Sequence, residues 1–306
     1  MSFHARPYAE LAGLDAMRRV LIEGQRASPH SGYIHLGDLN WWLFYLLRDY
    51  RLEDIAFLWE DGVGRVCGWS LLTPHLGAFD LFVSPEERVA EQLAPMLAWT
   101  EARLVEQVGE RPPESLVTMW VFDDDTLWRA VLEQRGYRRD PAYGLLYMRH
   151  TLDAIPAPEL PDGFRLAHVT DEIVEARAAA HRAAFGSARM TPGAYRQLRR
   201  APDYRAELDV VTLAPGGDVA SYVMGWCDAE NRMAEFEPVG TAPAFQRRGL
   251  GRAAMCEGLR RVQSFGAREA IVYAEIDNPA SQALYRSAGF RPTNRIGAYR
   301  RPLNGP

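Results

Sequence analysis

The chain contains no lysine, and this absence is its first constraint on function. All 35 of its basic residues are arginine, so a mechanism that needs a lysine nucleophile or Schiff base is excluded. Cysteine is scarce, since only Cys67, Cys227 and Cys256 are present, too few and too scattered for a disulfide framework or a zinc site. We therefore interpret the three cysteines as core thiols and expect no metal.

Other absences limit location and partners. No apolar run reaches the roughly 18 residues of a membrane helix, and residues 1–11 lack the apolar stretch of a signal peptide. The net charge of −5 lacks the basic excess typical of nucleic-acid binding. With 47% hydrophobic and 25% charged residues, the composition is that of an ordinary globular protein. We expect a cytoplasmic protein, monomeric or homodimeric, with neither nucleic-acid nor membrane partners.

A proline-rich segment divides the chain just past its middle. The length of 306 residues suits about two domains. Pro156, Pro158 and Pro161 can neither continue a helix nor donate to a sheet ladder, so we predict an interdomain linker over residues 153–162. The predicted domains are therefore residues 1–152 and 163–306.

The two halves share one order of expected elements. In the second half, strands over 210–214 and 221–228 flank the turn at 215–218, and in the first half strands over 55–60 and 66–72 flank Asp61-Gly62. Each hairpin leads to a further strand, a long helix, a strand, a short helix and a glycine-aromatic pair. Because the matched positions keep a nearly constant separation, we interpret the pattern as an internal duplication.

The most informative motif is the turn Gln246-Arg247-Arg248-Gly249-Leu250-Gly251, between an expected strand at 236–241 and an expected helix at 252–265. The first turn of a helix has N–H groups without intrahelical partners, and glycine lets a phosphate approach them. The turn therefore predicts an anion site, although an isolated Gly-x-Gly is also compatible with a plain solvated turn. A kinase or dehydrogenase nucleotide turn does not fit, because the P-loop lysine and a suitably placed parallel βαβ start are missing.

Together with residues farther along, this turn resembles the GNAT superfamily of N-acetyltransferases. The family motif Arg/Gln-x-x-Gly-x-Gly/Ala is met by Gln246, Gly249 and Gly251. A second motif, Asn-x-x-Ala-x-x-x-Tyr followed by Gly-Phe, is met from Asn278 to Tyr285, with Ser281 replacing the alanine. The resemblance covers residues 163–303 and implies an α+β fold with a mixed sheet. With the duplication, it implies two tandem GNAT folds, the N-terminal one degenerate.

The resemblance also implies acetyl-CoA as the acyl-donor substrate. Its pyrophosphate would lie against the glycine turn, and its pantetheine arm would pair like an added strand with the backbone of residues 239–241, a mode that a free strand edge permits. The residues assigned to the donor are Val239, Gly240, Thr241, Gln246, Arg247, Arg248, Gly249, Leu250, Gly251, Arg252 and Asn278.

Amide formation requires a neutral amine, and an alkyl amine of pKa about 10.4 is only about one part in a thousand neutral at pH 7. A general base lowers this cost. Glu235 and Glu237 lie on the expected strand, and a period of two places both on the face of Val239 and Thr241. The resemblance favours Glu235 as the base, with Glu237 as the open alternative and the strand-end carboxylates Glu275 and Asp277 as weaker candidates.

The resemblance places Tyr285 in the position of the general acid that protonates the departing thiolate. Around the acceptor, His181 lies on an expected helix over 171–185, where a lone histidine is more often simply solvated. The aromatic residues Trp226, Tyr195 and Tyr204 could line an acceptor pocket, but such residues are more often core.

The first half lacks the residues that carry the chemistry. The positions of Gln246, Gly249 and Gly251 hold Arg88, Glu91 and Leu93, and those of Glu235 and Tyr285 hold Gly77 and Leu132. Residues 1–152 are therefore expected to form a non-catalytic copy that packs on the active half, shapes the acceptor site or holds a regulatory ligand.

The whole sequence predicts an N-acetyltransferase that acts on a primary amine of a small molecule by direct attack in a ternary complex. Two alternatives remain open. One is an acyl-CoA-binding sensor or scaffold without turnover, and the other is the transfer of a longer acyl group.

Overall fold

The computed structural model describes residues 3–108 and 113–303. The chain forms two compact units. The first comprises Met1–His35, Leu47–Leu146 and Asn294–Pro306, and the second comprises Leu36–Leu46 and Tyr147–Thr293. Each unit thus contains a segment from the other half of the sequence. Residues 1–2, 109–112 and 304–306, which the predicted domains include, lie outside the described residues.

The first unit is a six-stranded part of a mixed sheet, and its strands follow the order β1 (His4–Pro7), β2 (Ala56–Glu60), β3 (Val66–Thr73), β4 (Ala78–Val83), β5 (Ser115–Phe122) and, from Asn294, β12 (Arg291–Pro302). Its strand neighbours pair antiparallel except β4 and β5, which pair parallel at Ala78 and Val117 alone. The short α-helices of this unit are α3 (Leu52–Ile55) and α5 (Thr126–Gln134).

The longest helices of the first unit cover opposite faces of its strands. Trp69 Nε1 donates a 3.1 Å hydrogen bond to the Met17 carbonyl of α1 (Glu10–Ala27). The next residue, Ser70, shares a 2.7 Å hydrogen bond with Thr100 of α4 (Ala90–Val108). Because successive strand residues point to opposite faces, α1 and α4 lie on either side of β3.

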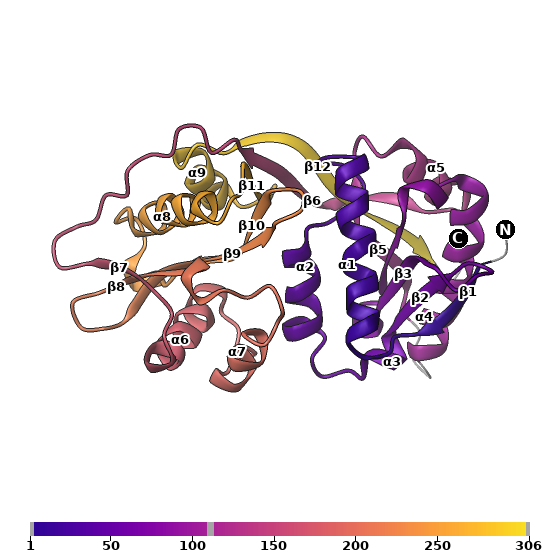
Figure 1. Ribbon diagram of the computed structural model, residues 1–306, viewed down its shortest axis with the longest axis horizontal. Coiled ribbons are helices and arrows are strands. Elements are labelled where there is room, and N and C mark those ends of the chain that lie inside the picture. The colour runs from indigo at the N-terminus through magenta and orange to yellow at the C-terminus, as the bar shows by residue number, and fades with distance from the viewer. Residues whose placement is uncertain (1–2, 109–112, 304–306) are drawn as a thin grey trace. The chain divides into compact units, whose positions relative to one another are not determined.

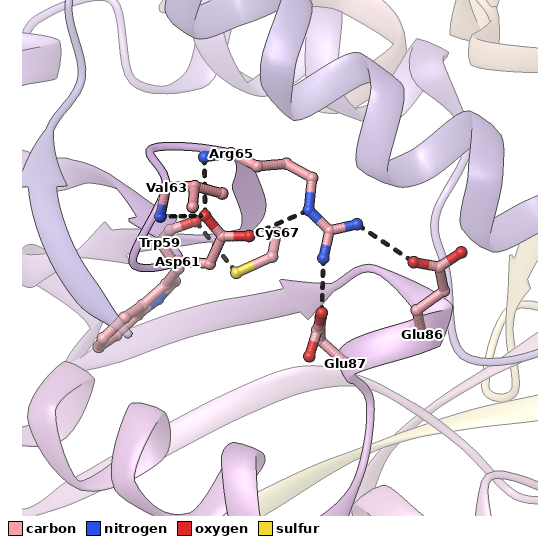
Figure 2. Close-up of polar contacts among 7 residues, drawn as sticks. All are labelled: Trp59, Asp61, Val63, Arg65, Cys67, Glu86 and Glu87. Atoms are coloured by element: carbon pink, nitrogen blue, oxygen red, sulfur yellow. Dashed lines mark hydrogen bonds and ion pairs between the residues drawn. The ribbon is translucent and has the colours of Figure 1, made fainter. Parts of the chain in front are cut away.

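The predicted turn at Asp61-Gly62 is confirmed, and a carboxylate organises it (Figure 2). Asp61 accepts hydrogen bonds from the backbone N–H groups of Val63 and Arg65, at 3.0 and 2.9 Å. The Arg65 guanidinium in turn bonds Glu86 at 3.1 Å and Glu87 at 2.6 Å. The segment that follows β4 therefore carries two acidic side chains tied to the hairpin.

The second unit has the strand order β6 (Arg138–His150, from Tyr147), β11 (Glu269–Glu275), β10 (Met233–Thr241), β9 (Val219–Asp228), β8 (Asp209–Leu213) and β7 (Arg165–His168). Strands β7 to β10 pair antiparallel, whereas β10 and β11 pair parallel. In Figure 1, α8 (Leu250–Ser264) and α9 (Pro279–Ser287) cover one face, and α6 (Val174–Phe185) and α7 (Pro192–Leu198) cover the other.

The segment contributed by the first half consists of α2 (Leu36–Trp41) and the π-helical turn Trp42–Leu46. Helix α2 contacts β9 and β10. Trp41 and Tyr45 of this segment pack on the His181 ring of α6, with ring centroids 5.8 and 6.0 Å away. The segment therefore belongs to the same side of the sheet as α6.

The mixed α+β fold predicted from the sequence is confirmed, and so are both hairpins. Helix α8 begins two residues earlier than expected, and the proline-rich residues 155–161 form neither helix nor strand. Among the described residues, no helix combines the length and the apolar character needed to cross a membrane.

Candidate active site in the second unit

The central strand β10 is open along part of one edge. It pairs with β11 only from Met233 to Glu235, whereas its pairing with β9 continues to Thr241. Beyond Glu235, no described strand pairs with this edge of β10, so the backbone of residues 239–241 takes no part in strand pairing on the side of β11. An extended amide-bearing ligand could pair there as an added strand.

A bulge in β10 shows that one expectation was wrong. Phe236 pairs with Gly225 but Val239 pairs with Val223, so β10 has one extra residue between them. The extra residue reverses the alternation of side chains. Glu235 contacts Gly37 and Asp38 of α2 and so lies on the α6 side, whereas Thr241 Oγ1 lies only 2.9 Å from the position of a Cβ built on Gly251 of α8. Glu235 and Thr241 therefore do not share a face.

The predicted phosphate turn is exposed and has an unusual backbone. Arg247 and Gly249 both have positive φ, at 59° and 79°, and a Cβ added to Gly249 would meet no described atom within 4 Å. Helix α8 begins directly afterwards at Leu250. A positive φ costs a non-glycine residue about 1 kcal/mol, and such conformations concentrate at ligand sites.

The side chains around this turn are anchored at its rim. Gln246 Nε2 donates to the Thr241 carbonyl at 3.3 Å, and Arg252 Nε donates to the Ser287 carbonyl at 3.1 Å. The Arg248 guanidinium lies 4.6 Å from the centre of the Phe164 ring. The turn thus combines the N–H groups of the first turn of α8, which have no intrahelical partners, with Arg247, Arg248 and Arg252. This combination suits the binding of an anionic group.

Glu235 is fully buried where the pairing of β10 with β11 ends. Its Oε2 accepts a 3.1 Å hydrogen bond from the backbone N–H of Asp38, in the segment from the first half. Gly37 permits this approach, because a Cβ there would lie 2.2 Å from Glu235 Oε2. Burial and then the nearby Glu237 raise the pKa of Glu235 to about 8, against the opposing effect of hydrogen bonds from Asp38.

Glu237 and Asp38 complete a group of three carboxyl side chains with Glu235. Glu237 is half-buried, and burial, followed by the charges of Asp38 and Glu275, raises its pKa to about 8. Its carbonyl accepts a 2.6 Å hydrogen bond from Trp226 Nε1. A carboxyl group whose pKa lies near neutral pH can accept a proton from an amine, so Glu235 and Glu237 have the chemistry of a general base.

Tyr285 is buried on α9, and its ring lies edge-on to Phe290 at 6.0 Å. Burial, followed by the charge of Glu237, raises the pKa of its hydroxyl, which therefore stays protonated at neutral pH. The helix begins as the sequence predicts, because Asn278 Oδ1 accepts a 3.0 Å hydrogen bond from the Ser281 N–H and caps it. The protonated Tyr285 hydroxyl is thus within electrostatic range of Glu237.

The remaining candidates differ in position. Glu275 and Asp277 are exposed, whereas Trp226 and Tyr195 are fully buried in the core. His181, expected to be solvated, is 4% exposed because the aromatic residues of Trp42–Leu46 and α2 cover it. Burial, then the charges of Arg177 and Arg182, lower its pKa to about 3.

The three cysteines are core thiols, as expected from their scatter. Cys67 and Cys256 are buried and Cys227 is partly buried. Burial raises the pKa of Cys67 and Cys227 to about 12 and also raises that of Cys256. In residues 3–108 and 113–303, no cluster of three or more His, Cys, Asp or Glu residues is arranged to hold a metal ion.

Asp38 is the site residue that the sequence did not reveal. It is 2% exposed and stands 197 residues before Glu235, in the half expected to lack catalysis. No motif surrounds it. The only pointer was the general expectation that the first half shapes the acceptor site.

Known proteins share the family and the fold of this chain. The model of the acetyltransferase (GNAT) family matches residues 171–290. A mycothiol acetyltransferase of Clavibacter sepedonicus is 30% identical over 213 residues, 67% of each chain. That of Clavibacter michiganensis subsp. michiganensis is 29% identical over 212 residues, 67% of this chain and 66% of the relative. The matches thus span about two thirds of the length of these relatives.

A solved structure extends the similarity of fold to the whole chain. A tandem GNAT protein from the clavulanic acid biosynthesis pathway superposes with a TM-score of 0.69 at 16% identity and covers 100% of both chains. Both halves of the present chain are therefore included in one tandem fold. From the family match, the relatives and this architecture together, the chain belongs to the GNAT family of acetyltransferases, in its tandem form.

Proposed function

We propose that the second unit transfers the acetyl group of acetyl-CoA to a primary amine of a small molecule. The observation that carries the proposal is the environment of Glu235, a fully buried carboxyl group whose pKa is raised to about 8, at the end of the open edge of β10. A general base works best when its pKa lies near the working pH. A carboxylate with an ordinary pKa would be a weaker proton acceptor for an amine.

The residues around the open edge fit acetyl-CoA as the donor substrate. The backbone of residues 239–241 would pair with the pantetheine arm, and the exposed turn from Gln246 to Gly251 would hold the pyrophosphate beside Arg247, Arg248 and Arg252. The open space at Gly249 is the local feature that supports this fit, since a side chain there would stand in front of the helix N-terminus.

In the proposed reaction, the amine attacks the thioester carbon directly in a ternary complex. The carbon–nitrogen bond forms, the carbon–sulfur bond breaks, and one amine proton passes to Glu235, either directly or through one water. Tyr285, protonated at neutral pH, supplies a proton to the departing thiolate. Since a thiol titrates near 8.5, this proton transfer favours departure of the sulfur. Glu237 remains the alternative base, because its pKa is raised as far as that of Glu235.

The acceptor side of the site is acidic. In their ionised forms, Glu235 and Glu237 would attract an amine as its ammonium ion, and one carboxylate could then accept the proton that must leave before attack. The relatives named mycothiol acetyltransferases make the acceptor of those enzymes the first amine to test. The first half would serve this site without catalysis, by contributing Leu36–Leu46.

The test is thiol release from acetyl-CoA in the presence of a panel of small primary amines, with the wild type and the variants Glu235→Gln and Tyr285→Phe. We expect amine-dependent release by the wild type, a reduction of about 10²-fold or more in each variant, and nearly unchanged acetyl-CoA affinity. Thermal stabilisation by acetyl-CoA without thiol release for any amine would instead support a sensor or scaffold. Unchanged turnover in both variants would refute the assigned roles.

A further inference from the structure

Tyr222 of β9 occupies the space above Gly240, in the part of β10 that has the open edge. The two residues form a cross-strand pair. A Cβ built on Gly240 would lie 2.4 Å from Tyr222 Oη and 2.5 Å from Cζ. The tyrosine ring therefore lies across the glycine, and its hydroxyl end covers the α6 side of the strand. Gly240 has an ordinary φ, so the tyrosine, and not the backbone, excludes a side chain at this position.

A buried charged group fixes the Tyr222 ring from behind. The guanidinium of Arg177, which is fully buried, stacks over the ring with its Cζ 3.5 Å from the centroid. Arg177 Nε donates a 3.0 Å hydrogen bond to Asp209, which also accepts from the Tyr195 hydroxyl. No described residue hydrogen-bonds Nη1 or Nη2 of Arg177, and the Tyr222 ring lies nearer to the guanidinium carbon than the Tyr195 ring, which is 5.2 Å away. Burying a guanidinium in this way is costly.

His181 fixes the hydroxyl end of the same ring. Its Nδ1 lies 3.0 Å from Tyr222 Oη, and its pKa near 3 keeps the imidazole neutral through the physiological range. The hydrogen bond therefore persists across that range. Tyr222 is thus held on its ring face by Arg177 and at its tip by His181, which leaves it little freedom to move aside.

Tyr222 and Tyr285 lie on opposite faces of the sheet near the open edge. Tyr222 is on the α6 side, whereas Tyr285 packs through Phe290 toward Phe236, whose ring faces Gly258 of α8. Their hydroxyl groups still influence each other electrostatically. The acyl end of a donor paired with residues 239–241 would lie at the sheet edge, with Tyr222 on the α6 side and Tyr285 on the α8 side.

We propose that Tyr222 is a specificity-determining residue that limits the length of the transferred acyl group. This inference rests on the proposed function, because it assumes that the donor arm pairs with the open edge of β10. The ring fills the volume that an acyl chain longer than acetyl would enter on the α6 side. Because Arg177 and His181 hold the ring in place, a longer chain cannot displace it cheaply. The site therefore selects acetyl-CoA over propionyl-CoA and butyryl-CoA.

The test compares kcat/KM for acetyl-CoA, propionyl-CoA and butyryl-CoA by thiol release. In Tyr222→Ala and in the less disruptive Tyr222→Leu, we expect the butyryl-to-acetyl ratio to rise about tenfold or more, since each methylene in a pocket contributes about 10-fold or more to discrimination. Tyr222→Phe keeps the ring and should keep the selectivity. Adding Gly240→Ala to Tyr222→Ala restores bulk to the same space and should lower the ratio again.

A matched control separates selectivity from stability. Tyr195→Phe removes a hydrogen bond to Asp209 in the same network but leaves Gly240 covered, so it should lower the melting temperature without changing the acyl ratio. Calorimetric binding of acetyl-CoA and butyryl-CoA without amine gives the same comparison in the absence of turnover.

If neither binding nor turnover changes its acyl preference in Tyr222→Ala and Tyr222→Leu, the inference is overturned. If the wild type releases no thiol but Tyr222→Ala gains affinity for butyryl-CoA, the proposed transfer fails, while the limit that Tyr222 sets on the length of the bound acyl group stands.

Discussion

The backbone N–H of Asp38 donates a 3.1 Å hydrogen bond to Glu235, although the two residues are 197 positions apart. This contact places a segment of the first half, which we expect to be non-catalytic, directly on the carboxyl group that we propose as the base. The N–H favours the ionised form of Glu235, whereas burial and Glu237 favour the neutral form. The balance leaves a buried carboxyl group that changes its charge near neutral pH.

The pH dependence of turnover should report this balance. Glu235 must be ionised to accept a proton, so kcat/KM should rise with pH through about 8 and fall roughly tenfold per unit below it. In Glu235→Gln this step should vanish, leaving the titration of the amine alone. Glu230→Gln, at an exposed position of the same unit, should keep the wild-type profile. A Glu235→Gln profile with the same step would contradict the role of Glu235 as the base.

Stability should depend on pH with the opposite sign. The pKa of Glu235 is raised from 4.5 to about 8 in the folded protein, so the folded state binds its proton more tightly than the unfolded chain does. The stabilisation is complete below pH 4.5 and is lost as the pH rises to about 8. Glu235→Gln has no such loss. The free energy of unfolding of the variant, relative to that of the wild type, should therefore rise by about 2–4 kcal/mol between pH 4.5 and pH 8.

Urea unfolding of both proteins at pH values between 4.5 and 8 measures this difference. A difference between the variant and the wild type that stays constant over the whole range would show that the pKa of Glu235 is not raised.

Acetyl-CoA affinity should depend on the open space at Gly249. Gly249→Ala adds a methyl group beside the helix N-terminus at a φ of 79°, so we expect a loss of about 1 kcal/mol of stability and a weaker affinity for acetyl-CoA, by about tenfold. Gly266→Ala is the matched control, because Gly266 also has a positive φ, 97°, and an open Cβ position. It should lose stability but bind acetyl-CoA normally. Equal affinities in calorimetry would argue against a phosphate at this turn.

One acetyl-CoA should bind per chain. In the first unit, the segment after β4 carries Glu86 and Glu87, and Arg88 is paired with Asp125. The Tyr33 hydroxyl also donates a 2.7 Å hydrogen bond to the Val83 carbonyl at the end of β4. Negative charge and occupied polar groups thus replace a phosphate cradle. Calorimetry should give a stoichiometry near one, and two equivalents per chain would contradict the loss of function in the first half.

Local signals made much of the fold readable from the sequence. Asp61 and Asn278 bond their own neighbouring backbone, so the turn and the helix that they begin follow from nearby residues. The turn before α8 is local as well, because glycine and the helix N-terminus define it. These features gave the family resemblance, the mixed sheet and the position of the candidate donor site.

Other features depend on tertiary contacts and were not predictable from these patterns. The extra residue between Phe236 and Val239 changes which side chains share a face. The sequence pattern around Glu237-Pro238 instead suggests one continuous strand. Asp38 reaches Glu235 only through the exchange of Leu36–Leu46 into the second unit. Likewise, His181 is buried because aromatic residues from that distant segment cover it.

This exchange has a consequence for how the chain can change over generations. If the chain were cut within residues 155–161, each fragment would lack a segment of its own unit. The N-terminal fragment would lack Asn294–Pro306 and the C-terminal fragment would lack Leu36–Leu46. A gene that lost the first half would therefore also lose the neighbour of Glu235. Part of the first half is thus required by the second unit, independently of any chemistry of its own.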